Sequence, residues 1–516
     1  MTRNCMAETF DVVVIGGGPA GSTAARLLAQ WGHSTLILNK PPAKHPALAE
    51  SLPPTCRKLF GFLGILERLD AAGFYPARGN TVWWGDSRTR AENFDRPGYQ
   101  VLRSDFDRLL LELAGVSGAR IRHGAAARDV DLRVPDQARI EYEPARGAKA
   151  SVAARYVLDC SGRAGVVARK ALRRKERYST LAIAGVWKQD HDRQVPDAGH
   201  TLVETYRDGW AWSVPISSEM RCFAVMVNGH EAPRSRGLKD LYRADLDKTI
   251  HFKRILSEAT LTSGPWSCDA SLYFASRYAG PNFLLVGDAG SFIEPLSSFG
   301  VKKAIASAWV AAVAVHTCLK RPEIREAALD FFSAREQQVY ASYLRQSARY
   351  FQEAAQYHPH PFWLARAQTG LDSHAWEPDE EELKRDPEVL AAFESLKQSP
   401  SINLRVSPGV RVEKKAGIDG REIALVDAVV SPGLPGGVRF LGNVNLPRLL
   451  KIAAGYNQVP DLFDAYNRLC PPVEIPNFLG ALSVLLAKGI LTNEGQRGKG
   501  DDLRVPVKSG FLGNDK

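Results

Sequence analysis

The stretch Thr9-Phe10-Asp11-Val12-Val13-Val14-Ile15-Gly16-Gly17-Gly18-Pro19-Ala20-Gly21 decides the fold of this chain. Its four consecutive β-branched residues, 12–15, predict a buried strand. Residues 22–31, rich in Ala and Leu, predict a helix, and the apolar run 34–38 predicts the next strand. The sequence therefore predicts a βαβ unit with its glycines at the first turn.

Three of these glycines are spaced as G-x-G-x-x-G between the predicted strand and the predicted helix. Gly16 permits the tight turn, Gly18 lacks the Cβ that would collide with a pyrophosphate, and Gly21 lets the helix approach the strand. Pro19 and Ala20 belong to the same turn, and the N-terminus of the helix that follows offers amide groups to phosphates. We therefore expect a dinucleotide site at this turn.

The end of the second strand differs from the usual pattern. An acidic residue usually stands there and binds the ribose hydroxyls. Here Leu38 is followed by Asn39 and Lys40. Because Asn39 can donate and accept hydrogen bonds but has no charge, we expect it to hold the adenosine end, beside Lys40, less strongly than an acid would. This difference does not separate FAD from NAD.

Two further motifs lie far along the chain. Val286-Gly287-Asp288-Ala289 follows a predicted strand over 282–286 and precedes a helix expected over 297–319. A carboxylate at this position can hold a ribityl hydroxyl, and the following helix can point its positive end at a flavin. The stretch Leu158-Asp159-Cys160-Ser161-Gly162-Arg163 ends another predicted strand.

These three motifs, in this order, resemble the flavoprotein monooxygenase superfamily of the para-hydroxybenzoate hydroxylase type, over roughly residues 8–350. In that superfamily the motifs contact FAD. The resemblance therefore implies FAD as cofactor, bound by the glycine turn together with Asp159, Gly287 and Asp288. Arg103, just before an expected helix, matches a flavin-contacting arginine, with a surface salt bridge as the alternative. Since only one G-x-G-x-x-G is present, we expect no second Rossmann domain for NAD(P)H.

Three segments resemble the flavin-dependent halogenase branch of that superfamily. They are Glu50-Ser51-Leu52-Pro53-Pro54, Gly209-Trp210-Ala211-Trp212-Ser213-Val214-Pro215, and Phe292-Ile293-Glu294-Pro295-Leu296-Ser297-Ser298-Phe299-Gly300-Val301. The resemblance implies that Pro295, Gly300 and Val301 lie on the flavin side. Trp210 and Trp212 occupy one face of a strand. In the family they separate the flavin from the organic substrate, and plain strand packing is the alternative.

The halogenases of this branch pass hypohalous acid to the substrate with a lysine. The matching stretch here is Ala77-Arg78-Gly79-Asn80-Thr81-Val82-Trp83-Trp84-Gly85, and it has no lysine. Arg78 is a poor substitute because a guanidinium stays protonated, although Lys40 or Lys58 would serve if the alignment were shifted. Phe299 also replaces a small residue of the halide loop. Both departures favour monooxygenation, and the stretch also resembles flavoproteins that modify protein-bound tryptophan during quinone-cofactor biogenesis.

We therefore expect an FAD-dependent monooxygenase that hydroxylates an electron-rich aromatic ring through a flavin C4a-hydroperoxide, with peptide- or protein-bound tryptophan as the candidate substrate. Trp83, Trp84, Trp210 and Trp212 are the expected lining of a dry site. NAD(P)H or a flavin reductase would supply electrons. One alternative is a halogenase that takes FADH2 from a partner reductase. Another is a peptide-binding scaffold with a degenerate flavin site, for which Asn39 is the hint.

The length of 516 residues, at ~150 residues per domain, predicts about three domains. The expected class is α/β, a Rossmann-like FAD-binding domain interrupted by an antiparallel substrate sheet. The expected segments are 8–180 (FAD-binding domain with inserted strands), 181–280 (substrate sheet), 281–320 (return to the FAD-binding domain), 321–399 (helical), 400–495 (winged-helix-like α+β domain) and 496–516 (flexible tail).

The order strand, helix, Gly turn, helix, helix after residue 437 resembles a winged helix, and more narrowly the PqqD-like peptide-recognition domains of ribosomal peptide tailoring systems. Those domains bind a leader peptide at a sheet edge. A packing or dimerisation domain is the alternative. The expected recognition helix, 477–486, has no Lys or Arg, which disfavours DNA binding.

Composition sets the remaining expectations. The net charge of +10 comes from 67 basic and 57 acidic residues spread along the chain, so we expect no nucleic-acid partner. Seven cysteines without C-x-x-C spacing argue against zinc and disulfides and fit a reducing cytoplasm. The longest apolar run, 304–319, is too short for a membrane span. His358 and His360 lie in a Pro-rich loop, so no metal site is expected.

Overall fold

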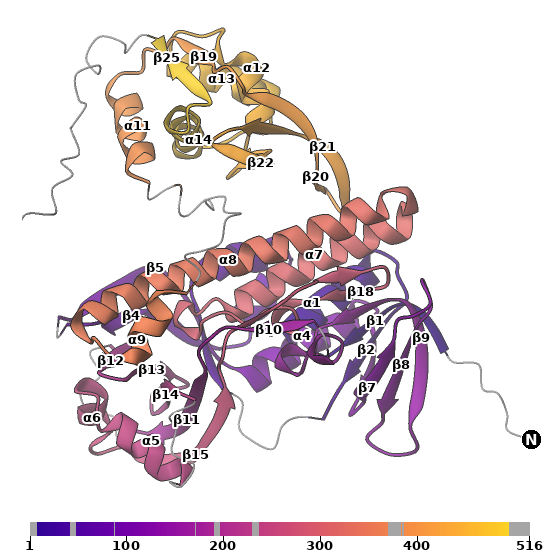
Figure 1. Cartoon of the computed structure of the whole chain (residues 1–516), viewed down its shortest axis with the longest axis vertical. Helices are drawn as coiled ribbons and strands as arrows, with labels where there is room; N and C mark the ends of the chain where they lie inside the picture. The colour runs from indigo at the N-terminus through magenta and orange to yellow at the C-terminus, as the bar shows by residue number, and fades with distance from the viewer. Residues whose placement is uncertain are drawn as a thin grey trace, which may run out of the picture. The chain divides into compact units, whose positions relative to one another are not determined.

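The computed structural model describes residues 8–41, 48–86, 88–170, 172–189, 197–229, 237–369, 383 and 386–494. The chain divides into two compact units. The first comprises Met1–His374 with Gly420–Ile423, and the second comprises Ala375–Asp419 with Ala424–Lys516. Figure 1 shows the helices and strands of each unit.

The first sheet of the first unit contains the predicted βαβ unit. Its strand order is β17-β18-β9-β1-β2-β6, and β18, β9, β1, β2 and β6 are parallel. The antiparallel hairpin of β7 and β8 continues from β9. The bounds are β1 (Glu8–Ile15), β2 (Thr35–Asn39), β6 (Arg120–His123), β7 (Ala126–Asp131), β8 (Ala138–Glu143), β9 (Ala150–Asp159), β17 (Ala279–Gly280) and β18 (Phe283–Leu285). Val12, Val13 and Val14 are fully buried, as a parallel strand covered on both faces requires.

Four helices pack on this sheet and on one another. They are α1 (Pro19–Gln30), α4 (Arg103–Val116), α7 (Gly300–Lys320) and α8 (Arg325–Tyr357). Two shorter ones, α2 (Thr55–Phe62) and α3 (Leu66–Asp70), follow β3. The small residues Ala24 and Ala25 of α1 are fully buried, so α1 and α7 approach closely. In Figure 1 the long helices α7 and α8 run side by side.

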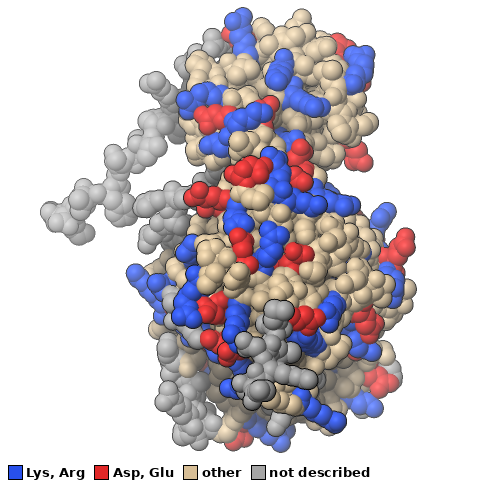
Figure 2. Space-filling model, turned by 90° about the vertical axis from the view of Figure 1, so that its right-hand side faces the viewer, with Lys and Arg blue, Asp and Glu red and all other residues tan. Residues whose placement is uncertain are grey.

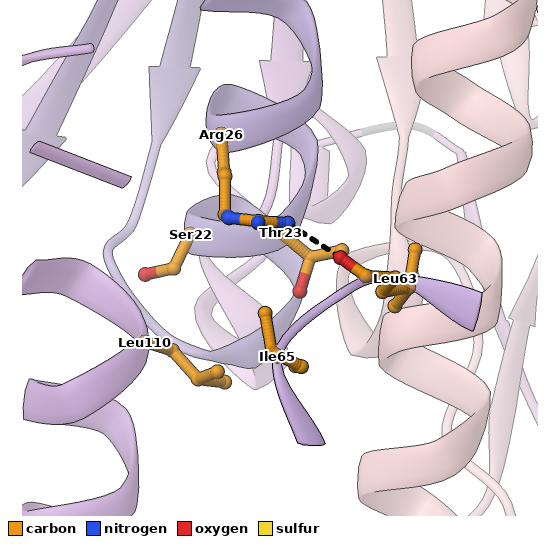
Figure 3. A pocket seen from close by; sticks show the side chains of 6 residues that line it. All are labelled: Ser22, Thr23, Arg26, Leu63, Ile65 and Leu110. Atoms are coloured by element: carbon orange, nitrogen blue, oxygen red, sulfur yellow. Dashed lines mark hydrogen bonds between the residues drawn. The ribbon is translucent and has the colours of Figure 1, made fainter. Parts of the chain in front are cut away.

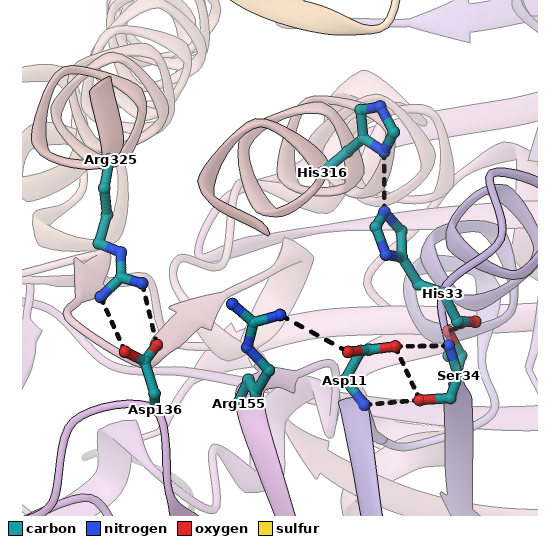
Figure 4. Close-up of polar contacts among 8 residues, drawn as sticks. Asp11, His33, Ser34, Asp136, Arg155, His316 and Arg325 are labelled. Carbon is teal, nitrogen blue, oxygen red and sulfur yellow. Dashed lines mark hydrogen bonds and ion pairs between the residues drawn. The ribbon is translucent and has the colours of Figure 1, made fainter. Parts of the chain in front are cut away.

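Polar contacts join α7 to the edge of the sheet away from the glycine turn (Figure 4). Asp11 of β1 accepts hydrogen bonds from the amide and the hydroxyl of Ser34, and Arg155 of β9 lies 3.7 Å from the same carboxylate. His33 Nε2 and His316 Nδ1 of α7 lie 2.8 Å apart. Among these contacts, the one between His33 and His316 links α7 to the loop that joins α1 to β2.

The second sheet has the order β15-β11-β14-β13-β12-β4-β5-β3, and its pairs are antiparallel except for β12 with β4. The bounds are β3 (Ala49–Leu52), β4 (Tyr75–Trp83), β5 (Arg90–Leu102), β11 (Thr180–Lys188), β12 (His200–Tyr206), β13 (Gly209–Pro215), β14 (Met220–Asn228) and β15 (Thr260–Asp269). A small two-stranded sheet joins β10 (Arg173–Lys175) to β16 (Tyr273–Ala275).

This second sheet is wider than the segment 181–280 that the sequence analysis assigned to it. Strands β3, β4 and β5 come from residues 49–102 and join it because Gly79–Trp83 pairs in parallel with His200–Glu204. Helices α5 (Leu238–Leu246) and α6 (His251–Leu256) cover one face. The end of α8 and the short α9 (Pro361–Ala367) cover the other face.

The second unit has its own apolar core. It contains α11 (Pro387–Gln398), β19 (Leu404–Val406), β20 (Arg411–Asp419), β21 (Glu422–Ser431), β22 (Leu434–Val438), β23 (Phe440–Leu441), β24 (Val444–Asn445), α12 (Leu446–Ala453), α13 (Val459–Leu469), α14 (Ile475–Ala487) and β25 (Leu491–Asn493). The core includes Leu449, Leu462 and Phe478. Helix α11, which the sequence analysis placed in the preceding helical segment, packs on α14, and Lys488 Nζ donates to Asp386 Oδ2 at 2.5 Å.

Basic and acidic side chains are interspersed on the face of the molecule that Figure 2 shows. This mixed pattern agrees with 67 basic and 57 acidic residues distributed along the chain. Within the described ranges, no helix has the length and apolarity that crossing a membrane requires. The expected tail, 496–516, lies outside the described residues.

Candidate active site

The glycine turn is shaped by close backbone contacts. Gly16 has φ +106°, and a Cβ on it would lie 2.5 Å from the carbonyl oxygen of Cys160. A Cβ on Gly21 would lie 1.9 Å from the carbonyl oxygen of Gly16. In contrast, the nearest atom to a Cβ on Gly18 is Asp107 Oδ2, at 3.7 Å. The fold itself therefore requires glycine at positions 16 and 21, while the side of Gly18 is open.

Gly18 is also the N-cap of α1, and no side chain caps the helix. The first amide groups of α1, from Pro19-Ala20-Gly21 onward, thus adjoin the open side of Gly18. Helix N-termini of this kind stabilise phosphate groups. We propose that the pyrophosphate of a dinucleotide lies against Gly18, as the sequence predicts.

Asn39 lies beside the glycine turn, which is consistent with the predicted contact to the ribose of the adenosine. It ends β2, and its Oδ1 would lie 2.9 Å from a Cβ on Gly17, so its side chain borders the glycine turn. Lys40 follows with an exposed side chain. We propose that Asn39 contacts the adenosine end and that Lys40 contributes charge at the rim.

Asp159, predicted from the sequence to contact the cofactor, is hydrogen-bonded within the protein to the turn that follows it. It is fully buried. Its carboxylate accepts hydrogen bonds from Ser161 N at 3.1 Å, Ser161 Oγ at 2.6 Å and Val167 N at 2.7 Å. Because both oxygens are bonded to the protein, we propose that Asp159 shapes the turn whose Cys160 carbonyl packs on Gly16.

A cluster of charges adjoins the open side of Gly18, where Asp107 is its nearest member. Arg103 opens α4, and its Nε and Nη2 donate to Asp107 at 2.9 and 3.1 Å. Its Nη1 donates to Glu50 Oε1 of β3 at 3.3 Å. Burial raises the pKa of Glu50, although Arg103 opposes this shift, and the charge of Asp288 acts on both residues. The sequence analysis did not predict the ion pair between Arg103 and Asp107. The two residues are four positions apart on a helix, and this spacing favours such a pair.

Asp288 lies in a short 3₁₀ turn, Gly287–Ala289, that packs on α7. Gly287 has φ +63°, and its amide donates to Ser307 Oγ of α7 at 3.0 Å. Lys303 of α7 donates to Asp288 Oδ1 at 3.3 Å and to the Ser291 carbonyl. Lys303 is only 3% exposed. Sequence reasoning missed this lysine, which stands directly before the apolar run 304–319 in the helix expected after the motif.

A buried acid extends this ion pair. Glu336 of α8 is 2% exposed, and burial raises its pKa to about 7, while the charge of Lys303 lowers it. Asp288, Lys303 and Glu336 therefore connect the motif to both long helices. A flavin contact at Asp288 is our proposal from this placement.

The segment before α7 forms the second predicted flavin contact. Pro295 starts a 3₁₀ turn, Gly300 starts α7, and Val301 is buried. A Cβ on Gly300 would meet nothing within 4 Å, so open space adjoins this helix N-terminus. The ring of Phe299 lies 5.8 Å from that of Tyr343 and 4.8 Å from Lys302 Nζ.

The four predicted tryptophans do not share one site. Trp84 and Trp210 have ring centroids 6.4 Å apart, and Trp212 packs on the same hydrophobic cluster. Trp83 instead stacks on His251 at 4.1 Å, in the cluster beneath α5 and α6. Adjacent residues of an extended chain point to opposite faces, so Trp83 and Trp84 line opposite faces of the sheet.

A small cavity lies beside α1 (Figure 3). Its lining is Ser22, Thr23, Arg26, Leu63, Ile65 and Leu110. Arg26 Nη1 donates to the Leu63 carbonyl at 2.7 Å, and Ser22 Oγ donates to the Gly17 carbonyl at 3.0 Å. The cavity therefore adjoins the back of the glycine turn.

Two histidines near α9 have structural contacts. His360 Nδ1 accepts a hydrogen bond from the amide of Phe362 at 3.2 Å and so caps α9. His358 Nε2 lies 3.4 Å from Thr205 Oγ1. Among the described residues, no group of three or more His, Cys, Asp or Glu side chains is arranged to hold a metal ion.

Comparison with known proteins agrees with this geometry. A family model described as an FAD binding domain matches residues 9–347. The chain belongs to the FAD-binding domain family. It is 28% identical over 365 residues to the flavin-dependent halogenase armH3 of Armillaria mellea, covering 65% of this chain and 72% of that protein. It is also 28% identical over 349 residues to the tryptophan 2-halogenase of Chondromyces crocatus, covering 63% of this chain and 65% of that protein.

Two solved structures match nearly the whole chain in fold. The flavin-dependent halogenase CmlS has a TM-score of 0.77 and 21% identity, covering 95% of this chain and 96% of that one. The peptidyl tryptophan dihydroxylase QhpG, essential for tryptophylquinone cofactor biogenesis, has a TM-score of 0.67 and 21% identity, covering 94% and 100%. The protein is therefore a flavin-dependent enzyme with a halogenase-like fold.

The cofactor of the family is FAD, and the residues of this chain fit it. The open side of Gly18 can accept a pyrophosphate, and Asn39 borders the same turn. Arg103 and Asp288 lie close enough for their charges to interact. Both stand beyond the carboxyl ends of the strands, which is where nucleotide cofactors bind in sheets of this type.

Proposed function

We propose that this protein is an FAD-dependent monooxygenase that hydroxylates an electron-rich aromatic ring. Bound FAD, once reduced, supplies the chemistry of oxygen activation. The chain supplies the glycine turn, the charges around Arg103 and Asp288, and an aromatic cluster that keeps water away. Hydroxylation and halogenation both use these parts, so the choice between them depends on other residues.

The observation that carries the proposal is the lack of a lysine on β4. A haloamine route needs an accessible lysine amine, and strand β4 with its flanking Trp84 and Gly85 contains none. Lys303, which is close to Asp288, donates to Asp288 and to the Ser291 carbonyl and is buried. Lys40 and Lys58 are exposed, but they lie after β2 and on α2, so neither stands at the position on β4 where the halogenase lysine is expected.

Phe299 supports the same conclusion. Its ring stands at the N-cap of α7, directly before the amide groups that would hold a halide. The contacts of the ring with Tyr343 and Lys302 keep it there. A bulky ring at this N-cap, where the halide loop of the family has a small residue, leaves less room for an anion beside those amides.

Trp84, Trp210 and Trp212 have the proposed role of keeping the site dry. They form one cluster with Phe351, Phe362 and Trp363 of α8 and α9. A water-poor site favours oxygen transfer over the release of hydrogen peroxide. Trp83 has no part in this role because it belongs to the opposite face.

The proposed substrate is tryptophan within a peptide or protein. Full-length similarity in fold to QhpG, which acts on peptidyl tryptophan, supports it. So does the second unit, where β20 is an edge strand of the β20-β21-β22 sheet. An edge strand can bind an extended peptide by backbone hydrogen bonds, as the winged-helix interpretation expects.

The second candidate function is halogenation with FADH2 from a separate reductase. The curated relatives favour it, since armH3 and the tryptophan 2-halogenase are halogenases. Incubating the enzyme with reduced FAD, oxygen and bromide against indoles, phenols and tryptophan peptides separates the two. We expect products that gain oxygen. Brominated products would contradict the proposal.

A further inference from the structure

Glu294 is a buried carboxylate within the segment that leads into α7. It is 2% exposed, and it precedes the 3₁₀ turn that starts at Pro295. Among the residues that the structure describes, neither Oε1 nor Oε2 of Glu294 has a hydrogen-bond partner. Buried polar groups in native proteins are nearly always hydrogen-bonded, so this carboxylate requires an explanation.

The surroundings of Glu294 are those of the proposed substrate site. Phe292 and Leu296, two residues to either side of it, pack on the cluster that contains Trp84 and Trp210. Because Glu294 is 2% exposed and stands between these two residues, its side chain lies inside the protein beside this cluster.

Two ionisable groups lie near Glu294. Arg366 of α9 interacts with it electrostatically, and so does Tyr178. However, the guanidinium of Arg366 donates to Thr180 Oγ1 at 2.7 Å, to the Ser179 carbonyl at 3.2 Å and to the Phe362 carbonyl at 2.8 Å. Burial raises the pKa of Glu294 to about 7, and Arg366 opposes this shift without forming a hydrogen bond to the carboxylate.

A second polar atom of the same cluster also lacks a partner. Trp210 is 1% exposed, and its Nε1 has no acceptor in the described part of the chain. By contrast, Trp84 Nε1 donates to the Tyr350 carbonyl at 2.9 Å. Trp210 within the cluster and Glu294 beside it thus offer one donor and one acceptor without partners among the described residues, which a ligand with complementary groups would satisfy.

We propose that Glu294 accepts a hydrogen bond from the ring N–H or O–H of the aromatic substrate, which makes an unsubstituted indole, pyrrole or phenol the class of ring that this site selects. This inference rests on the proposed function for the location of the substrate. Trp210 Nε1 donates to an oxygen of the same substrate, such as a peptide carbonyl. Glu294 is then a specificity-determining residue whose ligand replaces its missing partner.

The test compares the binding of indole and 1-methylindole, which lacks the N–H, to the FAD-loaded full-length protein. We expect the wild type to bind indole about tenfold to a hundredfold more tightly, as a hydrogen bond to a charged group implies. Glu294→Met removes the acceptor and should abolish this preference. Glu176→Gln is the matched control, because Glu176 already accepts from Tyr340 at 2.8 Å, and it should keep the preference.

The outcomes separate this inference from the proposed function. Equal binding of the two indoles by the wild type, failure of indole to bind, or a preference that survives Glu294→Met would overturn the role of Glu294. None of these results depends on turnover. Bromination of substrates by a protein that keeps the indole preference would instead overturn hydroxylation and leave the role of Glu294 intact.

Discussion

Lys303 Nζ lies 3.3 Å from Asp288 Oδ1, although fifteen residues separate them in the chain. The lysine is buried in α7, and it also donates to the Ser291 carbonyl. One ammonium group therefore connects the motif that precedes α7 with the helix itself. The aspartate proposed to contact the flavin is held in place by a cation that the solvent does not reach.

Replacing this cation should weaken FAD binding. In Lys303→Met, Asp288 keeps its charge but loses its ion-pair partner, and an unpaired, half-buried charge is unfavourable. We expect the Kd for FAD, measured by flavin fluorescence titration, to rise about tenfold. Lys320→Met, at the exposed end of the same helix, is the control. An unchanged Kd together with a lower Tm would show that Lys303 acts on the fold alone.

The glycines of the turn should separate cofactor binding from folding. In Gly18→Ala the new methyl has 3.7 Å of space, so the Tm of the cofactor-free protein should stay within a few degrees of the wild type while FAD binding is lost. In Gly21→Ala the methyl would collide with the Gly16 carbonyl at 1.9 Å, so the cofactor-free protein itself should be destabilised. Calorimetry with and without FAD measures both effects, and FAD binding by Gly18→Ala at wild-type affinity would place the pyrophosphate elsewhere.

Substitutions of the adjacent residues Trp83 and Trp84 should differ in how much reduced flavin is lost as hydrogen peroxide. Trp84→Phe alters the cluster proposed to exclude water, so hydrogen peroxide release per reduced flavin should increase several-fold. Trp83→Phe alters the opposite face, where the ring stacks on His251, and should leave the peroxide yield near that of the wild type. A peroxide assay during turnover compares them. Equal leakage from both variants would refute the assignment of the faces.

The stability of the protein should depend on pH through Glu294. Its pKa rises from 4.5 to about 7 on folding because of burial, so the folded protein binds this proton more tightly than the unfolded chain does. Stability from this group is therefore complete below pH 4.5 and declines as the pH rises toward 7, by roughly 3 kcal/mol in total. Glu294→Gln removes this dependence.

Denaturant unfolding of both proteins at pH 5 and pH 8 checks this expectation. The free energy of unfolding of Glu294→Gln, relative to the wild type, should be higher at pH 8 than at pH 5. Glu336 titrates in the same range in both proteins, so its contribution cancels in the difference. A difference that is the same at both pH values would mean that Glu294 is not titrating as described.

The parts of the fold that depend on local sequence were predictable. The β-branched run before Gly16 and the small residues after it set β1 and α1 through propensity and backbone freedom alone. The motif at Asp288 was found for the same reason, since it stands between a short apolar strand and a long apolar helix. The FAD cofactor and the halogenase-like family, expected from these motifs, are confirmed.

What local sequence could not give was the pairing of distant segments. The parallel contact of β4 with β12 joins residues more than a hundred positions apart, and it carries β3, β4 and β5 into the second sheet. The same contact sets which face Trp84 occupies. The partners of the Asp159 carboxylate also depend on the conformation of the single turn that follows β9. The hydrophobic periodicity of the sequence does not predict the conformation of such a turn.

We propose that this enzyme transfers oxygen, not halogen, to an aromatic ring. The most direct measurement is mass spectrometry of a tryptophan-containing peptide after turnover with reduced FAD, isotopically labelled oxygen gas and excess bromide. We expect one or two labelled oxygen atoms on the tryptophan and no bromine. A brominated peptide, or oxygen that carries no label, would contradict it.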